Sequence, residues 1–294
     1  MEIINTKHTD KLFCFIFGRK ENSKWTLDLY NALNGTNYDN PDDVQIFTIE
    51  NVLYMGMKND VALIVEDILS VYEQQSTYNP NMPVRELIYV SKLYNKYIKM
   101  NKLNIYSKST IRLPKPKLIV FYNGEKDKEN TILKLSDSFA ETSPDIEPDI
   151  SVNVTMININ YGNNADVLNK CSILQEYSWV IDKIRIYNKD MEMLEAVNSV
   201  LDEMPDSYRL KPFLVAHKAE VTDMCITEYD EKETLKAIGE EYFAEGKAEG
   251  RAEGRAEGRV ERQEENIRLI DELVKAGQVP ADIADIIISK ISEN

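Results

Sequence analysis

Two short apolar runs with one polar break between them constrain this chain more than any other feature. Residues 61–65 (VALIV) and 68–72 (ILSVY) are apolar and partly β-branched, and Glu66 and Asp67 separate them. Such runs, bounded by turn residues, predict β-strands joined as a hairpin. With a loop of two or four residues around Glu66 and Asp67, residues whose numbers sum to 133 face each other. Asp60 then lies opposite Glu73, whereas a loop of three residues would break this pairing.

The pairing of Asp60 with Glu73 places two carboxylates side by side. Directly opposed side chains have Cβ atoms roughly 4.5–5.5 Å apart, and like charges there are destabilising. Such a pair favours a bound cation, and Mg²⁺ is commonly held by one or two carboxylates together with substrate phosphate. Gln75 follows Glu73 by two residues and therefore lies on the same face. The alternative is a pair of solvated surface charges at the end of a hairpin, followed by ordinary turn residues.

A family resemblance rests on six segments. They are TDKLFCFIFG (9–18), ENVLY (50–54), KNDVA (58–62), YEQQST (72–77), NMPVR (81–85) and LIVFYNG (118–124). In this order the chain resembles the recombination-promoting nuclease (Rpn) family, also called YhgA-like transposases, of the PD-(D/E)XK nuclease superfamily. The resemblance covers the first half of the chain densely and the rest loosely. Gln75 stands where many members of the superfamily carry Lys, which puts the catalytic rate in question more than metal binding.

The resemblance implies an α/β fold with a PD-(D/E)XK nuclease-like core (αβββαβ), additional helices and a helical C-terminal tail. It implies a Mg²⁺- or Mn²⁺-dependent DNA endonuclease that hydrolyses phosphodiester bonds, with a role in recombination or transposition. Asp60 and Glu73 would bind the metal, Gln75 would orient water or phosphate, and Asp10 is an additional candidate acid. Two alternatives stay open: a catalytically weak DNA-binding or toxin-like interaction protein on the same fold, and an oligomeric scaffold.

The distribution of charge bears on DNA as the partner. The net charge is −15, yet residues 91–118 hold eight basic residues and no acid, which leaves −23 on the remainder. Residues 83–100 predict an amphipathic helix on which the basic side chains form one stripe, opposite Leu87, Val90, Tyr94, Tyr97 and Ile98. Such a stripe suits phosphate, and a solvated helix face is the alternative. The predicted DNA contacts are Arg85, Lys92, Lys96, Lys99 and Lys102.

The remaining pattern predicts a mixed order of helices and strands. Helices are expected over 9–17, 25–33, 166–204 and 212–227, strands within 44–57 and over 117–122 and 152–160, and an acidic loop over 136–149. Residues 1–230 form the predicted nuclease-like domain with its supporting helices. Residues 231–262 are a repeat helix or linker, and residues 263–294 form a helical hairpin.

The tail carries a four-residue repeat of Glu, Gly, Lys or Arg, and Ala over 245–260. On a helix this repeat makes a column of Glu opposed to a column of Lys and Arg, so i,i+4 neighbours carry like charges. Each glycine costs about 1 kcal/mol relative to alanine. We therefore expect either self-association through residues 245–294, which would bring Glu against Arg, or a flexible spacer.

Three widely spaced cysteines and two histidines disfavour zinc ribbons, disulfide frameworks and His-based metal sites. No apolar run approaches the length of a membrane span, and no leader pattern appears at the first residues. We therefore expect a cytoplasmic globular protein with no membrane partner.

Overall fold

The computed structural model describes residues 12–48, 60–126, 128–140 and 146–229, and scattered positions between 247 and 288. Its contacts divide the chain into two units, Met1–Glu228 and Tyr229–Asn294. Within the described residues no helix is long and apolar enough to cross a membrane. Asp10, the segment ENVLY and most of the predicted strand region 44–57 lie outside the described residues.

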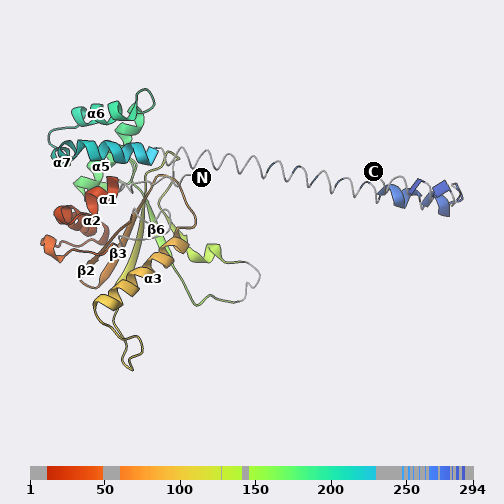
Figure 1. Cartoon of the computed structure of the whole chain (residues 1–294), viewed down its shortest axis with the longest axis horizontal. Helices are drawn as coiled ribbons and strands as arrows, with labels where there is room; N and C mark the ends of the chain where they lie inside the picture. Colours follow the sequence, from red (N-terminus) through yellow and green to blue (C-terminus); the bar gives the residue numbers. More distant parts are fainter. Residues whose placement is uncertain are drawn as a thin grey trace, which may run out of the picture. The chain divides into compact units, whose positions relative to one another are not determined.

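The first unit is a mixed α/β structure built on one six-stranded sheet (Figure 1). Its strands, in the spatial order β1-β2-β3-β4-β6-β5, are β1 Gln45–Ile46, β2 Asp60–Val65, β3 Ile68–Gln75, β4 Lys115–Tyr122, β6 Asn153–Asn158 and β5 Thr131–Lys134. The pairs β3–β4 and β4–β6 are parallel, and the other three pairs are antiparallel. The predicted strands at 117–122 and 152–160 are therefore present with shifted ends, whereas β5 was not predicted.

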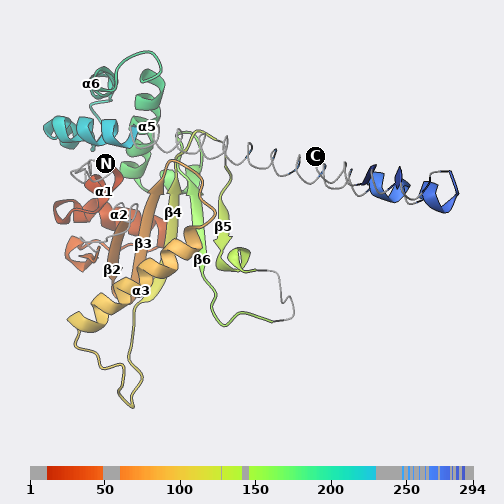
Figure 2. The same ribbon diagram turned by 45° about the vertical axis from the view of Figure 1, so that its right-hand side comes forward.

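Helices cover both faces of this sheet (Figure 2). One face carries α3 (Met82–Met100), and the other carries α1 (Leu12–Phe17), α2 (Ser23–Asn34), α5 (Ser172–Tyr187), α6 (Met193–Glu203) and α7 (Lys211–Ala216). The short helix α4 (Ala165–Leu168) precedes α5, and residues 218–229 are also helical. Single turns of 3₁₀-helix lie at Lys20–Asn22, Pro41–Asp43 and Leu135–Ser138.

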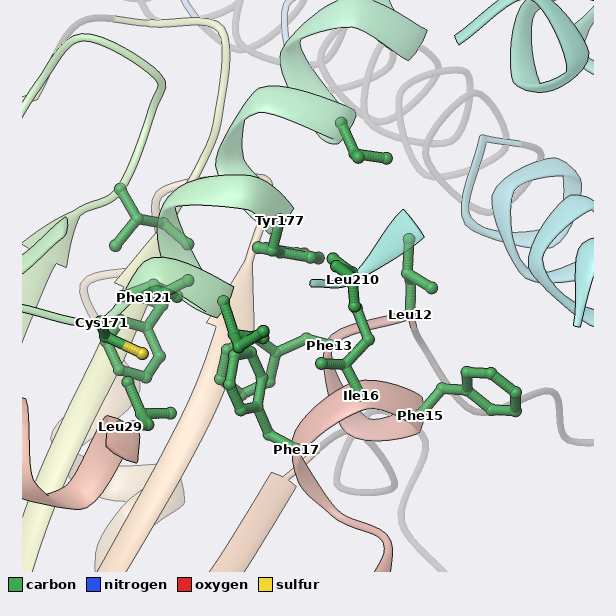
Figure 3. Close-up of a cluster of buried hydrophobic side chains, with 14 of the residues drawn as sticks. Leu12, Phe13, Phe15, Ile16, Phe17, Leu29, Phe121, Cys171, Tyr177 and Leu210 are labelled. Carbon is green, nitrogen blue, oxygen red and sulfur yellow. The ribbon is translucent and has the colours of Figure 1, made fainter. Parts of the chain in front are cut away.

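The larger core lies between the sheet and the helices of the first and last parts of this unit. Figure 3 shows Phe13 and Phe17 of α1 beside Phe121 of β4 and Tyr177 of α5. The rings of Phe13 and Phe121 are 5.2 Å apart, and those of Phe13 and Tyr177 are 5.8 Å apart. Because these aromatic side chains are fully buried, they tie the N-terminal helix to strands and helices that follow it by more than 100 residues.

Local signals explain several element ends. The helix predicted over 25–33 ends at Asn34 and is capped by Gly35, which has φ of 65° and donates its N–H to Asn31 O over 2.8 Å. In the β2–β3 hairpin, Glu66 takes the left-handed conformation with φ of 52°. The tight connection at Glu66 and Asp67 gives the hairpin register that the sequence predicts.

One packing prediction is wrong. The buried side chains of α3 are Met82, Pro83, Glu86, Tyr89, Val90 and Leu93, and this face borders the basic stripe instead of lying opposite to it. Of the predicted apolar face only Val90 is buried, while Leu87, Tyr94, Tyr97 and Ile98 are half-exposed. Buried Glu86 explains the error, because a charged residue was not counted on the apolar side.

Candidate functional site

The β2–β3 hairpin places Asp60 directly opposite Glu73. The pairing runs from Val65 and Ile68 beside the turn to Asp60 and Glu73 at the far end, as the numbering predicts. Both carboxyl side chains are nearly completely buried, with relative exposures of 3% for Asp60 and 2% for Glu73. The hairpin therefore does not end in a pair of solvated surface charges.

Side chains alternate between the two faces of a strand, and this alternation determines which residues surround the pair of carboxylates. Asp60 shares its face of β2 with Ala62 and Ile64, which pack in the same cluster as Tyr89 and Val90 of α3. Glu73 and Gln75 share the corresponding face of β3. The beginning of α3 therefore lies over the end of the hairpin that carries the carboxylates.

Glu73 is held by two donors. Arg85, in the first turn of α3, donates from its Nη2 to Oε1 of Glu73 over 2.6 Å. Gln75 donates from Nε2 to the same oxygen. The Arg85 side chain is 25% exposed and that of Glu73 only 3%, so the ion pair is mostly shielded from water. Arg85, predicted as a DNA contact, is here first of all a partner of Glu73.

Gln74 belongs to the opposite face of the sheet and to a separate polar network. Its Nε2 donates to Oδ1 of Asn123 over 2.6 Å, and Arg185 donates to the carbonyl oxygen of Asn123. Arg185 also donates to Oδ1 of Asn160 over 3.2 Å. This network holds the segment that follows β4 against α5. Gln74 therefore contacts Asn123 on one face of the sheet, whereas the adjacent Gln75 contacts Glu73 on the other face.

Glu86 is a buried acid that sequence reasoning missed. Its side chain is 1% exposed, and neither carboxyl oxygen has a hydrogen-bond partner among the described residues. Burial raises the pKa of Glu86 well above its ordinary value, the charge of Glu73 raises it further, and Arg85 lowers it. The place of Glu86 next to Arg85 in the motif NMPVRE was the one available signal.

The acid pair fits a hard divalent cation. Among the described residues, no three His, Cys, Asp or Glu side chains gather closely enough to hold a metal ion. Mg²⁺, however, commonly takes one or two carboxylates from a protein and completes its shell with water and phosphate. Asp60, Glu73 and Gln75 offer oxygen ligands, which suit Mg²⁺ or Mn²⁺. The pair could therefore hold such an ion only together with water or substrate.

The predicted DNA contacts on and after α3 differ in their surroundings. Lys96 donates from Nζ to the carbonyl oxygens of Phe47 and Thr48 over 3.0 and 2.9 Å, and it lies 4.5 Å from the centre of the Phe47 ring. Lys92 is half-buried, whereas Lys99 and Lys102 are exposed. Lys96 thus helps to hold the segment before β2, and the exposed cations lie toward the C-terminal end of α3.

No family model, no curated protein and no solved structure matches this chain.

Proposed function

We propose that this protein is a Mg²⁺- or Mn²⁺-dependent DNA endonuclease of the PD-(D/E)XK type. The observation that carries the proposal is the buried pair of Asp60 and Glu73 on neighbouring strands, with Gln75 on the same face. Two buried carboxylates repel each other, and this repulsion lowers the free energy of unfolding unless a cation offsets it. A fold that keeps both carboxylates therefore points to a bound cation or to a functional role. The resemblance to the Rpn family supplies the reaction.

The order of elements supports the nuclease core. Helices α1 and α2 precede three strands, β1 to β3, and α3 then crosses to β4, which lies parallel to β3. This order agrees with the αβββαβ core that the resemblance implies. The carboxylates lie at the end of β3 where α3 begins, so strand and helix both contribute to the site.

Each side chain has a defined part in the proposed reaction. Asp60 and Glu73 would hold the cation, which supplies Lewis-acid polarisation of the phosphate and an activated water. Gln75 donates its amide to Glu73 and would orient that carboxylate or the water. Arg85 neutralises Glu73 in the metal-free protein, and its guanidinium suits phosphate as well as carboxylate.

A second candidate is a DNA-binding or toxin-like protein that keeps this fold but cleaves weakly. Two observations favour it. Gln75 offers an amide where many members of the superfamily carry an amine, and Arg85 already provides Glu73 with a cationic partner. A carboxylate satisfied in this way binds a metal ion less readily, because the ion must compete with the guanidinium.

Cleavage of supercoiled plasmid by the full chain tests the proposal. We expect nicking or linearisation with Mg²⁺, none with EDTA, and a loss of at least about a hundredfold for Asp60→Asn and Glu73→Gln, since one carboxylate ligand is removed. Asp43→Asn is the matched control and should cleave like the wild type, because Asp43 is exposed and precedes β1, which pairs with the hairpin near its turn and not at the carboxylate end.

Full activity in both site variants would refute the assignment of Asp60 and Glu73. An inactive wild-type protein that still binds DNA would favour the second candidate. Melting temperatures of the variants, measured in EDTA, separate lost chemistry from lost structure: an intact fold is expected for Asp60→Asn, because the substitution removes charge without removing volume.

A further inference from the structure

The connection between α3 and β4 is a protruding loop with an apolar tip. We call residues 101–114 the α3–β4 loop. Figures 1 and 2 both show it in yellow, extending past the end of α3 and away from the sheet. At its tip Ile105 is 59% exposed and Tyr106 is 88% exposed. Two large side chains held in water at the end of a projection indicate a contact surface.

Hydrogen bonds hold the loop in shape. At the tip, Asn104 accepts the N–H of Tyr106 on its side-chain oxygen over 2.9 Å and the N–H of Ser107 on its carbonyl oxygen over 3.1 Å. At the base, the Tyr94 hydroxyl donates to the carbonyl oxygen of Pro114 over 2.9 Å. Tyr106 is therefore presented by a preformed turn, which lowers the entropy lost on binding.

The charges on this loop are all of one sign. Lys102, Lys108 and Arg112 are exposed, and the loop contains no Asp or Glu. None of these three cations has an ion pair among the described residues, while Lys115 at the base lies 3.4 Å from Asp67. On a chain with a net charge of −15, this concentration of cations around an exposed tyrosine complements a polyanion.

The position of the loop relative to the carboxylates follows from α3. Arg85 contacts Glu73, and Met100, at the far end of the helix, lies fifteen residues later. At 1.5 Å per residue this is about 22 Å. With 3.4 Å per base pair along duplex DNA, the same distance spans roughly six or seven base pairs.

We propose that the α3–β4 loop binds duplex DNA at least roughly six or seven base pairs from the phosphate that faces Asp60 and Glu73, because the loop extends beyond Met100. Lys102, Lys108 and Arg112 contact backbone phosphates, and the ring of Tyr106 lies against the groove edge. The position on the substrate rests on the proposed nuclease function, whereas the binding of DNA by the loop does not. Exposed Lys99 continues the same row of charge along α3 toward the site, which favours DNA over a membrane surface as the partner.

Affinity as a function of duplex length tests this proposal. The full chain is titrated in EDTA with labelled duplexes of about 8, 12, 16 and 24 base pairs, chosen to bracket the distance above. The wild-type protein should gain affinity up to the longer duplexes. The triple variant Lys102→Gln, Lys108→Gln, Arg112→Gln should lose most of that gain, about tenfold or more on the longest duplex, and its log–log salt slope should fall by up to about 2.7.

Controls separate the loop from net charge. Lys170→Gln, Lys189→Gln and Lys218→Gln together remove three exposed lysines elsewhere and should leave both affinity and salt slope unchanged. Tyr106→Ala should weaken binding to the longer duplexes, whereas Tyr106→Phe, which keeps the ring, should bind like the wild type. A circular dichroism spectrum like that of the wild type shows that each variant is folded.

Equal affinities of the wild type and the loop triple variant at every length would overturn the proposal, even if the protein cleaves DNA. Length-dependent binding that needs the loop, together with an absence of cleavage, would support the loop and refute the nuclease. Binding of the wild type to anionic lipid vesicles but to no duplex would overturn the DNA assignment and make a membrane surface the partner.

Discussion

At the scale of single residues, three acids illustrate what the sequence could and could not predict. The pairing of Asp60 with Glu73 follows from counting outward from one turn, so it was predictable. The burial of Glu86 was not, because hydrophobic patterning assigns a glutamate to the solvent side of a helix. The contact of Arg85 with Glu73 also needed the structure, since it joins a helix to a strand and depends on how the helix lies over the sheet.

The raised pKa of Glu86 gives a prediction for stability against pH. As pH rises above the pKa of an unfolded glutamate, the unfolded state ionises while buried Glu86 stays protonated, so the folded state loses relative stability until pH passes the raised folded pKa. Each unit of pKa difference is worth about 1.4 kcal/mol. Glu86→Gln, which cannot ionise, should therefore raise the melting temperature more at pH 8 than at pH 5.

Thermal unfolding of the wild type and Glu86→Gln at both pH values measures this difference. Glu129→Gln, at an exposed position, is the matched control and should shift the melting temperature equally at the two pH values. A Glu86→Gln protein that is less stable than the wild type at pH 8 would contradict a neutral, unpartnered carboxyl at this position.

At the scale of elements, the sequence best predicted those helices and strands whose secondary structure follows from a single hydrophobic pattern. The hairpin, the helix after it and the strand at 117–122 were predicted because continuous apolar runs or helical patterns lie between turn signals. Strand β5 was missed because Thr131–Lys134 is short, and only Leu133 of its four residues is buried. The interruption of the predicted helix 212–227 at His217 left no pattern either, since its flanking residues are all helix-compatible.

Gly124 shows how an element end can depend on one missing atom. A Cβ at this position would collide with the carbonyl oxygen of Ser76 and with the hydroxyl of Tyr122. Ser76 directly follows β3, so the clash would displace the end of the strand that carries Glu73 and Gln75. Gly124→Ala should destabilise the fold by about 1–3 kcal/mol, the usual cost of overpacking.

Urea unfolding of the full chain measures the loss caused by Gly124→Ala. Gly254→Ala is the matched control, because a Cβ there meets nothing within 4 Å and alanine favours a helix. Equal midpoints for Gly124→Ala and the wild type would show that the segment after β4 adapts without cost.

At the scale of the whole molecule, charge and apolar surface are distributed unevenly. The region 91–118 carries its eight bases on a chain with a net charge of −15, and three of its five exposed bases lie in the α3–β4 loop. In the second unit, Leu269, Leu273, Ile283 and Ile287 are exposed by 39% to 52%. These four residues form two i,i+4 pairs, the spacing of an apolar stripe on a helix.

Such stripes favour the self-association that the tail repeat predicts. A second copy of the tail would cover Leu269, Leu273, Ile283 and Ile287 and would bring the Glu column of the repeat against the Lys and Arg column of its partner. Sedimentation of the full chain should show a concentration-dependent dimer, and a chain truncated after Tyr242 should remain a monomer.

Leu269→Ser with Leu273→Ser should weaken the dimer by tenfold or more, since about 1–2 kcal/mol of apolar burial is lost for each leucine. Lys275→Gln, at an exposed position outside both the repeat and the apolar stripes, is the control for any change in the tail and should dimerise like the wild type. If the full and truncated chains sediment as the same species at the same concentration, the tail is a spacer. If only the full chain dimerises, two proposed nuclease domains reach DNA together, and the plasmid assay should then give linear product in preference to nicked circles.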